Sequence, residues 1–343
     1  MRRIMLAIAI LSVSTTDTSA QLVPENSQAA SVDIGYRRAS SFRVDPFRHV
    51  MIPHWGFAFS FGGTGENSVL NFADIGALRF INNNDKIIPG DIIDVIGLIP
   101  AGKGLRVAAQ ADGGFHLGGP FGRHFSLGFS AQVRSYGSGL FSDGLASLVR
   151  DGNLTQSRFD IAGSGGIGLA TAELGAHTVL RLGPLGTEDG IHLSLGIGGR
   201  LVRAGAYYQA RPQLGSSTVF RSGPDSIVAD LAFESFETSI DDFSDRFNSA
   251  PSSLVGDFLI RMEWPTNGFS FEAMFANLGS VTAPDVERKT AGLIVATTDP
   301  LFSGELADSI DAMDFVFVDS VDVYVKLPQI IRFSAGAWVN AIL

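Results

Sequence analysis

Three histidines, His124, His177 and His192, are the side chains best suited to acid–base chemistry near neutral pH. Each stands in a run where apolar and polar residues alternate, and each falls on the polar side of its run. Glu173 shares that side with His177, so a carboxylate could orient an imidazole that activates a serine, as in a hydrolase. Histidines that face water and have no catalytic role explain the same pattern more simply. A hydrolase that uses these histidines inside a β-barrel therefore ranks third among three functional hypotheses. We predict no catalytic residue.

Residues 163–168 spell Gly-Ser-Gly-Gly-Ile-Gly, which matches the G-x-G-x-x-G nucleotide-binding pattern. They lie among alternating strand residues, with no helix after them and no acidic residue at the distance that would hold a ribose. No G-x-S-x-G, H-E-x-x-H or phosphate-binding-loop motif occurs, and the chain has no cysteine to serve as nucleophile or metal ligand. We predict no cofactor and no enzymatic activity.

An acidic group of Asp241, Asp242 and Asp245 stands near Glu234 and Glu237. Carboxylates in this number could bind Ca²⁺, or bridge to lipopolysaccharide through divalent cations. A loop whose acidic side chains are simply solvated explains them with fewer assumptions, so we predict no metal site.

Eight segments of the chain, each seven to eleven residues long, alternate between apolar and polar residues. In one of them, Phe125, Leu127 and Phe129 oppose Ser126 and Gly128. Such segments have one apolar face and one face that must meet water, and ten residues is the length of a tilted strand that crosses a bilayer. The segments are 55–61, 105–112, 124–134, 172–182, 191–200, 257–264, 269–275 and 331–337.

The connections between these segments alternate between short and long. The short ones are residues 118–122, 183–190 and 265–268, and the long ones are 63–103, 137–156, 209–254 and 277–328. Antiparallel transmembrane β-barrels of the outer membrane have tight periplasmic turns and long outer loops. Trp55, Trp264 and Trp338 stand at or near strand ends, as in interfacial girdles. The alternative is a soluble β-sandwich, in which the apolar faces would meet in a core.

The N-terminus supports the same location. Arg2 and Arg3 precede an apolar run over residues 4–13, and small residues at 18–20 fit a signal-peptide cleavage site. We therefore expect a signal peptide at 1–20, an N-terminal periplasmic segment at 21–53 and a barrel at 54–343, in the cell outer membrane. No run reaches the length of a transmembrane helix although 45% of the residues are hydrophobic, which fits strands with one lipid-facing side. The net charge of −10 disfavours nucleic acid as a partner.

Short helices are predicted inside the long connections. Pro89 can begin one that ends before Pro100, Ser142 can cap one over residues 143–150, and Pro300 can begin another that extends to residue 313. They could form a lid over the barrel mouth, or they could simply pack the loops.

Residues 271–279, Phe-Glu-Ala-Met-Phe-Ala-Asn-Leu-Gly, resemble the strand ending in Asn-Leu-Gly of the long-chain fatty-acid transporter superfamily and of related TraF-like and uncharacterised outer-membrane barrel families. Residues 327–337 are similar to the Leu-Pro and Gly-Ala strand of those families, and 172–175 fit the same pattern. The resemblance implies uptake of a small hydrophobic molecule, an N-terminal plug and further strands. Residues 21–53 show no clear plug-forming segment.

The inward positions of the predicted strands are too small to fill even a narrow barrel. Because the resemblance also implies further strands, we expect an incomplete curved wall with an unpaired edge between the first and last strands, from a larger barrel that is truncated at its C-terminus. The alternative is a complete eight-stranded barrel with an unusual last strand. The small inward residues are Gly128, Ser130, Gly175, Ser194, Gly196, Gly198, Ser270 and Ser334.

Two functional hypotheses precede the hydrolase. The first is passive or facilitated uptake of a small hydrophobic ligand, and the second is a structural, assembly or secretion-associated role without transport. The expected partners are outer-membrane lipid, lipopolysaccharide and the barrel insertion machinery. A continuous apolar groove inside the wall would favour uptake, whereas a filled interior would favour the structural role.

Overall fold

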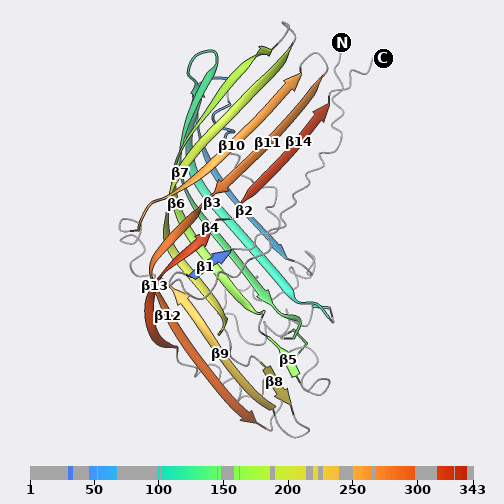
Figure 1. Ribbon diagram of the computed structural model, residues 1–343, viewed down its shortest axis with the longest axis vertical. Coiled ribbons are helices and arrows are strands. Elements are labelled where there is room, and N and C mark those ends of the chain that lie inside the picture. The colour runs from blue at the N-terminus through green and yellow to red at the C-terminus, as the bar shows by residue number, and fades with distance from the viewer. Residues whose placement is uncertain are drawn as a thin grey trace.

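The computed structural model describes residues 30–33, 46–51, 53–67, 99–100, 102–144, 146–147, 158–161, 163–185, 190–213, 219–222, 227–238, 250–264, 268–297, 315–327 and 329–337. Within this part of the chain, fourteen strands form one sheet, so the fold is all-β (Figure 1). All pairs are antiparallel except β1 beside β13. The strands are β1 (Ala30–Asp33), β2 (Gly56–Asn67), β3 (Leu105–Pro120), β4 (Phe125–Phe141), β5 (Arg158–Asp160), β6 (Gly165–Leu185), β7 (Ile191–Pro212), β8 (Val219–Ser222), β9 (Ile227–Glu237), β10 (Ser253–Trp264), β11 (Phe269–Leu278), β12 (Ser280–Thr297), β13 (Val316–Lys326) and β14 (Ile330–Ala337).

The main wall is made of eight crossings. Five are the single strands β2, β3, β4, β6 and β7. Each of the other three is broken into two strands that run in the same direction, β9 before β10, β11 before β12 and β13 before β14. Because of these breaks, the first half of β7 pairs with β10 and its end pairs with β9. Figure 1 shows β10, β11 and β14 in the upper part of the sheet and β9, β12 and β13 in the lower part.

The eight predicted alternating segments all coincide with strands, namely β2, β3, β4, β6, β7, β10, β11 and β14. The prediction that residues 209–254 and 277–328 are only long connections is wrong, because β8, β9, β12 and β13 lie there. The register between β12 and β13 shifts once between Ala283 and Val286, where Asp285 has a φ of 49°, and again between Arg288 and Lys289. The first shift places an extra residue in β12 and moves the following side chains to the other face, so β12 does not read as one alternating run; the second places the extra residue in β13.

The sheet has free edges in the described part of the chain. There, β2 pairs only with β3, and β14 pairs only with β11, so the first and last crossings do not pair with each other. This agrees with the predicted open wall. At the lower part, β1 adds a short parallel strand beside β13.

The two faces of the sheet differ in which side chains they expose and which they bury. On what we call the outer face, the alternating apolar side chains are exposed, and Phe59 is 67% accessible. On the opposite, inner face, polar and charged side chains are buried, and Arg200 is 1% accessible. A soluble sandwich would bring the apolar faces together in a core, which this sheet does not do.

Helical structure is sparse in the described residues. Residues 143, 144, 146 and 147 are helical after Ser142, and the Ala146 amide donates to the Ser142 carbonyl at 3.0 Å, which agrees with the predicted helix start. The predicted helices at 89–100 and 300–313 fall, wholly or nearly so, outside the described residues. In the described part of the chain, no helix has the length and apolarity needed to span a membrane.

Residues 46–51 form a turn that packs on the inner face. The amides of Val50 and Met51 donate to the Phe47 carbonyl at 3.0 and 3.2 Å. Phe47 and Val50 are fully buried in an apolar cluster with wall residues Val179, Leu259 and Met274. Part of the N-terminal region therefore occupies the interior, although its sequence shows no plug-forming pattern. We call residues 46–51 the inner segment.

The inward glycines make room for this inner segment. A Cβ atom at Gly128 would lie 2.7 Å from side-chain atoms of both His49 and Val50, and one at Gly196 would lie 2.7 Å from the Phe47 ring. The interpretation that these small residues leave the interior empty is therefore wrong. Gly128 and Gly196 are small because the inner segment fills the space next to them, and Gly175 and Gly198 because wall side chains such as His177 do.

We predict that Gly128→Ala loosens the inner segment, because the added methyl group overlaps His49 and Val50. Gly199→Ala is the matched control, since a Cβ there meets its nearest neighbour, Leu254, at an ordinary 3.5 Å. Hydrogen exchange of the amides in residues 46–51 should speed up by about tenfold in Gly128→Ala only. Unchanged exchange in Gly128→Ala would contradict the packing described.

Candidate functional site

The inner face is built in layers that follow one another along β6, β7 and β10. At the rim with the short turns, Arg181, His192 and Arg261 line a cavity. The next layer is the apolar cluster that holds the inner segment. Below it lies a layer of buried charge, and then a larger apolar cluster whose members are Tyr136, Leu169, Val202, Ala204, Tyr207, Phe236, Val255, Val281, Ala283, Val286, Val323, Val325 and Leu327.

Arg200 is the centre of the layer of buried charge. Its Nε and Nη2 donate to the two carboxylate oxygens of Asp257, both at 2.9 Å, in a bidentate pair. Its Nη1 donates to Glu173 Oε2 at 2.6 Å. All three side chains are at most 1% accessible. A charge at this depth is tolerated only when it is paired and hydrogen-bonded, and this geometry meets that condition.

Asn277 closes the layer on the β11 side. Its Oδ1 accepts from Arg200 Nη2, and its backbone amide donates to Asp257 Oδ1 at 3.0 Å. Asn277 has a φ of 61°, a left-handed conformation that asparagine tolerates better than most residues. This residue is the asparagine of the Asn-Leu-Gly motif, so the motif has a structural role here.

Glu173 is held by three further side chains. Gln132 Nε2 donates to Oε2 at 3.0 Å, Thr171 Oγ1 donates to Oε1 at 3.2 Å, and Arg134 Nη1 lies 3.6 Å from Oε2. Two arginines thus balance Glu173 and Asp257, and these groups together carry no net charge. We call Arg134, Glu173, Arg200, Asp257 and Asn277, with Gln132, Thr171 and His177, the ionic layer.

The ionic layer connects five strands. Its members come from β4, β6, β7, β10 and β11. All but Asn277 lie on the inner face by the alternation of their strands, and Asn277 reaches the layer because the register shifts beside it and its φ is 61°. Both carboxylates are fully committed to cationic or amide donors, so neither is placed to act as a general base. The layer holds the wall together and fills the interior at its depth.

A row of histidines runs from the ionic layer across the inner segment. His177 Nε2 donates to Asp257 Oδ2 at 2.9 Å. The His49 ring centroid lies 5.8 Å from that of His177 and 5.1 Å from that of His116. His116 Nε2 is 2.8 Å from Ser60 Oγ. The serine and the carboxylate therefore pair with different histidines, so no Ser-His-Asp triad forms among the described residues.

The three histidines that the sequence singled out do not form one site. His177 and Glu173 both belong to the ionic layer, whereas His124 and His192 line the cavity at the rim. His177 pairs with Asp257 rather than with Glu173. The nucleotide-binding reading of residues 163–168 finds no support, since 165–168 belong to β6 and no helix follows them.

Asp257, Phe47 and His49 are site residues that the sequence did not single out, and Asn277 was marked only as part of the Asn-Leu-Gly motif. Asp257 stands opposite Gly198 on β7, beside Arg200, so strand alternation with the correct register could have found this ion pair. No pattern in the sequence marks Phe47 or His49, because they lie on no strand.

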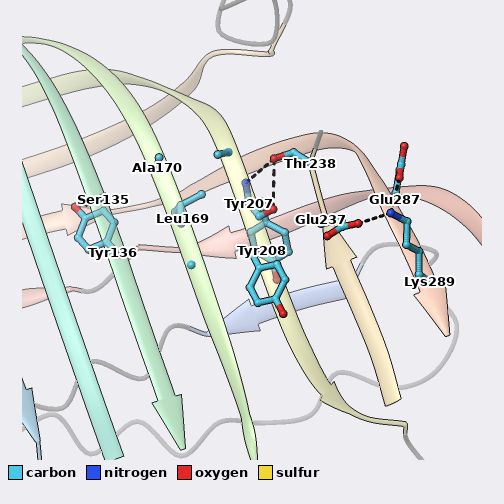
Figure 2. Close-up of a pocket in the computed structure, with 12 residues that line it drawn as sticks. Ser135, Tyr136, Leu169, Ala170, Tyr207, Tyr208, Glu237, Thr238, Glu287 and Lys289 are labelled. Carbon is cyan, nitrogen blue, oxygen red and sulfur yellow. Dashed lines mark hydrogen bonds and ion pairs between the residues drawn. The ribbon is translucent and has the colours of Figure 1, made fainter. Parts of the chain in front are cut away.

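On the outer face, polar and charged side chains lie below the exposed apolar ones, in the lower part of the sheet. A pocket of about 590 Å³ lies there, lined by Tyr208, Glu237 and Lys289 among others. Figure 2 shows these side chains. Hydrogen bonds to Glu237 and Glu287 raise the pKa of Lys289 above its ordinary value. Polar and charged groups thus replace the exposed apolar residues at this level.

The acidic group predicted near Glu234 and Glu237 is only partly visible. Glu234 Oε2 pairs with Arg211 Nη2 at 3.1 Å, and Glu237 pairs with Lys289, so both carboxylates have cationic partners. Asp241, Asp242 and Asp245 lie outside the described residues. No group of three or more residues that could hold a metal ion occurs in the part of the chain that is described. No family model, curated protein or solved structure matches the chain.

We predict that Arg200→Met destabilises the fold by about 3–5 kcal/mol, because Asp257 and Glu173 then lose their principal cation while remaining buried. Arg261→Met is the control: it removes a half-exposed pair with Glu263, and should cost at most about 1 kcal/mol. Unfolding titrations of both variants measure the difference. Equal losses would show that the ionic layer is not a desolvated network.

Proposed function

We propose that this chain forms the wall of an outer-membrane β-barrel that admits a small hydrophobic molecule when the inner segment moves. The proposal includes no catalytic step. One observation carries the membrane assignment: charged side chains are buried on the inner face while aromatic and aliphatic side chains are exposed on the outer face. Lipid on one side and a polar interior on the other is the solvent arrangement that stabilises such a sheet.

The exposed apolar belt has a suitable height. On β6 it extends from Leu182 to Ala172, which at about 3.3 Å per residue and a tilt of about 40° corresponds to about 25 Å across a bilayer. Trp55 and Trp264 are exposed at the upper end of the belt, and Tyr208 is exposed below its lower end. Aromatic residues at the two limits of an apolar band are typical of contact with lipid head groups.

Free strand edges support a barrel larger than this sheet. Backbone amides on the edges of β2 and β14 would be costly in hydrocarbon, so further strands must cover them. Lipid, lipopolysaccharide and the barrel insertion machinery are the partners that such a protein would meet.

The inner segment favours uptake. A barrel with a purely structural role can fill its interior with side chains from its own wall. Here the wall presents Gly128 and Gly196 where the inner segment packs, and Phe47 and Val50 of that segment lie in an apolar cluster with side chains of the wall. Withdrawal of the segment would open space next to the rim cavity without breaking a strand.

The ionic layer favours the second candidate function, a structural or assembly role. It fills the interior at its depth with paired charges, which a passing hydrophobic molecule could not replace. Uptake through this wall would therefore use a route on the rim side of the ionic layer, such as a lateral exit.

We predict that Phe59→Arg reduces the free energy of folding in lipid vesicles by about 2–4 kcal/mol, because Phe59 is exposed within the apolar belt. Phe121→Arg is the control, since Phe121 is equally exposed but lies in the turn between β3 and β4, where the cost should be about 0–1 kcal/mol. Folding titrations in vesicles decide the matter. If both variants fold like the unsubstituted protein, the outer face does not meet lipid.

Uptake is tested in cells whose outer membrane excludes a hydrophobic fluorescent dye. Expression of the protein should raise the initial rate of dye entry, and Gly128→Ala should raise it further at equal protein levels, because the inner segment is loosened. Gly199→Ala should behave like the unsubstituted protein. Entry rates that do not change on expression of any of the three would favour the structural role.

A further inference from the structure

The cavity at the short-turn rim has a volume of about 390 Å³, within the range of small-molecule sites. Arg123, Arg181 and Arg261 line it, together with His124 and His192. These residues come from the turn between β3 and β4 and from β6, β7 and β10, so the fold assembles positive charge from distant parts of the sequence. The whole chain carries 25 basic against 35 acidic residues, which makes such a concentration of arginine unusual for this protein.

Two of the arginines are available to a ligand. Arg261 pairs with Glu263, the one acidic residue in the lining, with 2.5 Å between Nη2 and Oε1. Arg123 and Arg181 make no ion pair with any described residue. Guanidinium groups bind carboxylate and phosphate through paired N–H donors.

We propose that the rim cavity binds a small organic anion through a carboxylate or phosphate group, with Arg123 and Arg181 as its principal contacts. Met51 and Pro53 also line the cavity and offer an apolar wall for the rest of the molecule. Met51 belongs to the inner segment, so an occupant of the cavity touches the segment directly. Binding is therefore coupled to the position of the inner segment, and it does not require that the protein transports anything.

Titration calorimetry of the purified protein in detergent, with hexanoate, hexyl phosphate, inorganic phosphate and hexan-1-ol as probes, tests the site. At least one organic anion should bind, and hexan-1-ol should not. Arg123→Gln and Arg181→Gln should each weaken anion binding by at least about tenfold. Glu263→Gln should strengthen it, because the competing carboxylate is gone. Arg106→Gln, an exposed arginine near the other end of β3, removes the same charge and should leave binding unchanged.

Hydrogen exchange provides a second measurement, which a nonspecific effect of charge would not change. Hexanoate or hexyl phosphate should slow exchange in residues 46–51 of the unsubstituted protein and should have no such effect in Arg181→Gln. Inorganic phosphate that binds as tightly as hexyl phosphate would support the anion site and assign it to the free ion.

Three results would overturn the proposal: no anion binds at millimolar concentration, hexan-1-ol binds as tightly as hexanoate, or Arg106→Gln weakens binding as much as Arg181→Gln. A failure of dye uptake in cells would leave the anion site standing, since binding is measured on the isolated protein.

Discussion

The desolvation of Arg200 is the constraint on which the rest of the interior depends. A guanidinium group between two apolar clusters is stable only with Asp257, Glu173 and Asn277 in place, and these partners come from three other strands. Register is therefore specified: a shift of one residue in β10 would turn Asp257 to the outer face and leave Arg200 without its bidentate partner. The left-handed backbone at Asn277 follows from the same requirement, because it places both an amide and a side-chain oxygen at the layer.

The inner segment packs on the rim side of the ionic layer, so its position depends on that layer. Gly196 and Gly198 precede Arg200 on the same face of β7, and they leave space for the Phe47 and His177 rings respectively. The strands of the wall are fixed there, whereas the inner segment is a turn that can withdraw. A filled interior therefore does not by itself exclude the passage of a small molecule. The buried charge and the glycines thus divide the interior into a fixed part and a part that can move.

Strand alternation predicted the eight crossings and the polarity of their faces, because a period of two is present directly in residues such as Phe125 to Arg134. The open edge was predicted from the small inward residues and the family resemblance instead. Alternation failed where bulges interrupt the period, as at Asp285 in β12. In β13, Val321, Val323 and Val325 do alternate, so that strand was readable and was missed. The sequence placed Glu173, His177 and Arg200 on the inner face, but their mutual contacts depend on register between distant strands. The inner segment carries no periodic signal at all.

The central claim is that the outer face of this sheet meets hydrocarbon. The chain has no cysteine, so single cysteines on the outer face of β6 at positions 172–182 can each carry a spin label in lipid vesicles. We predict that collisions with dissolved oxygen are greatest near Ala176 and fall toward both ends, while collisions with a water-soluble nickel complex show the opposite profile. Uniform access of the nickel complex along the whole run would contradict the account.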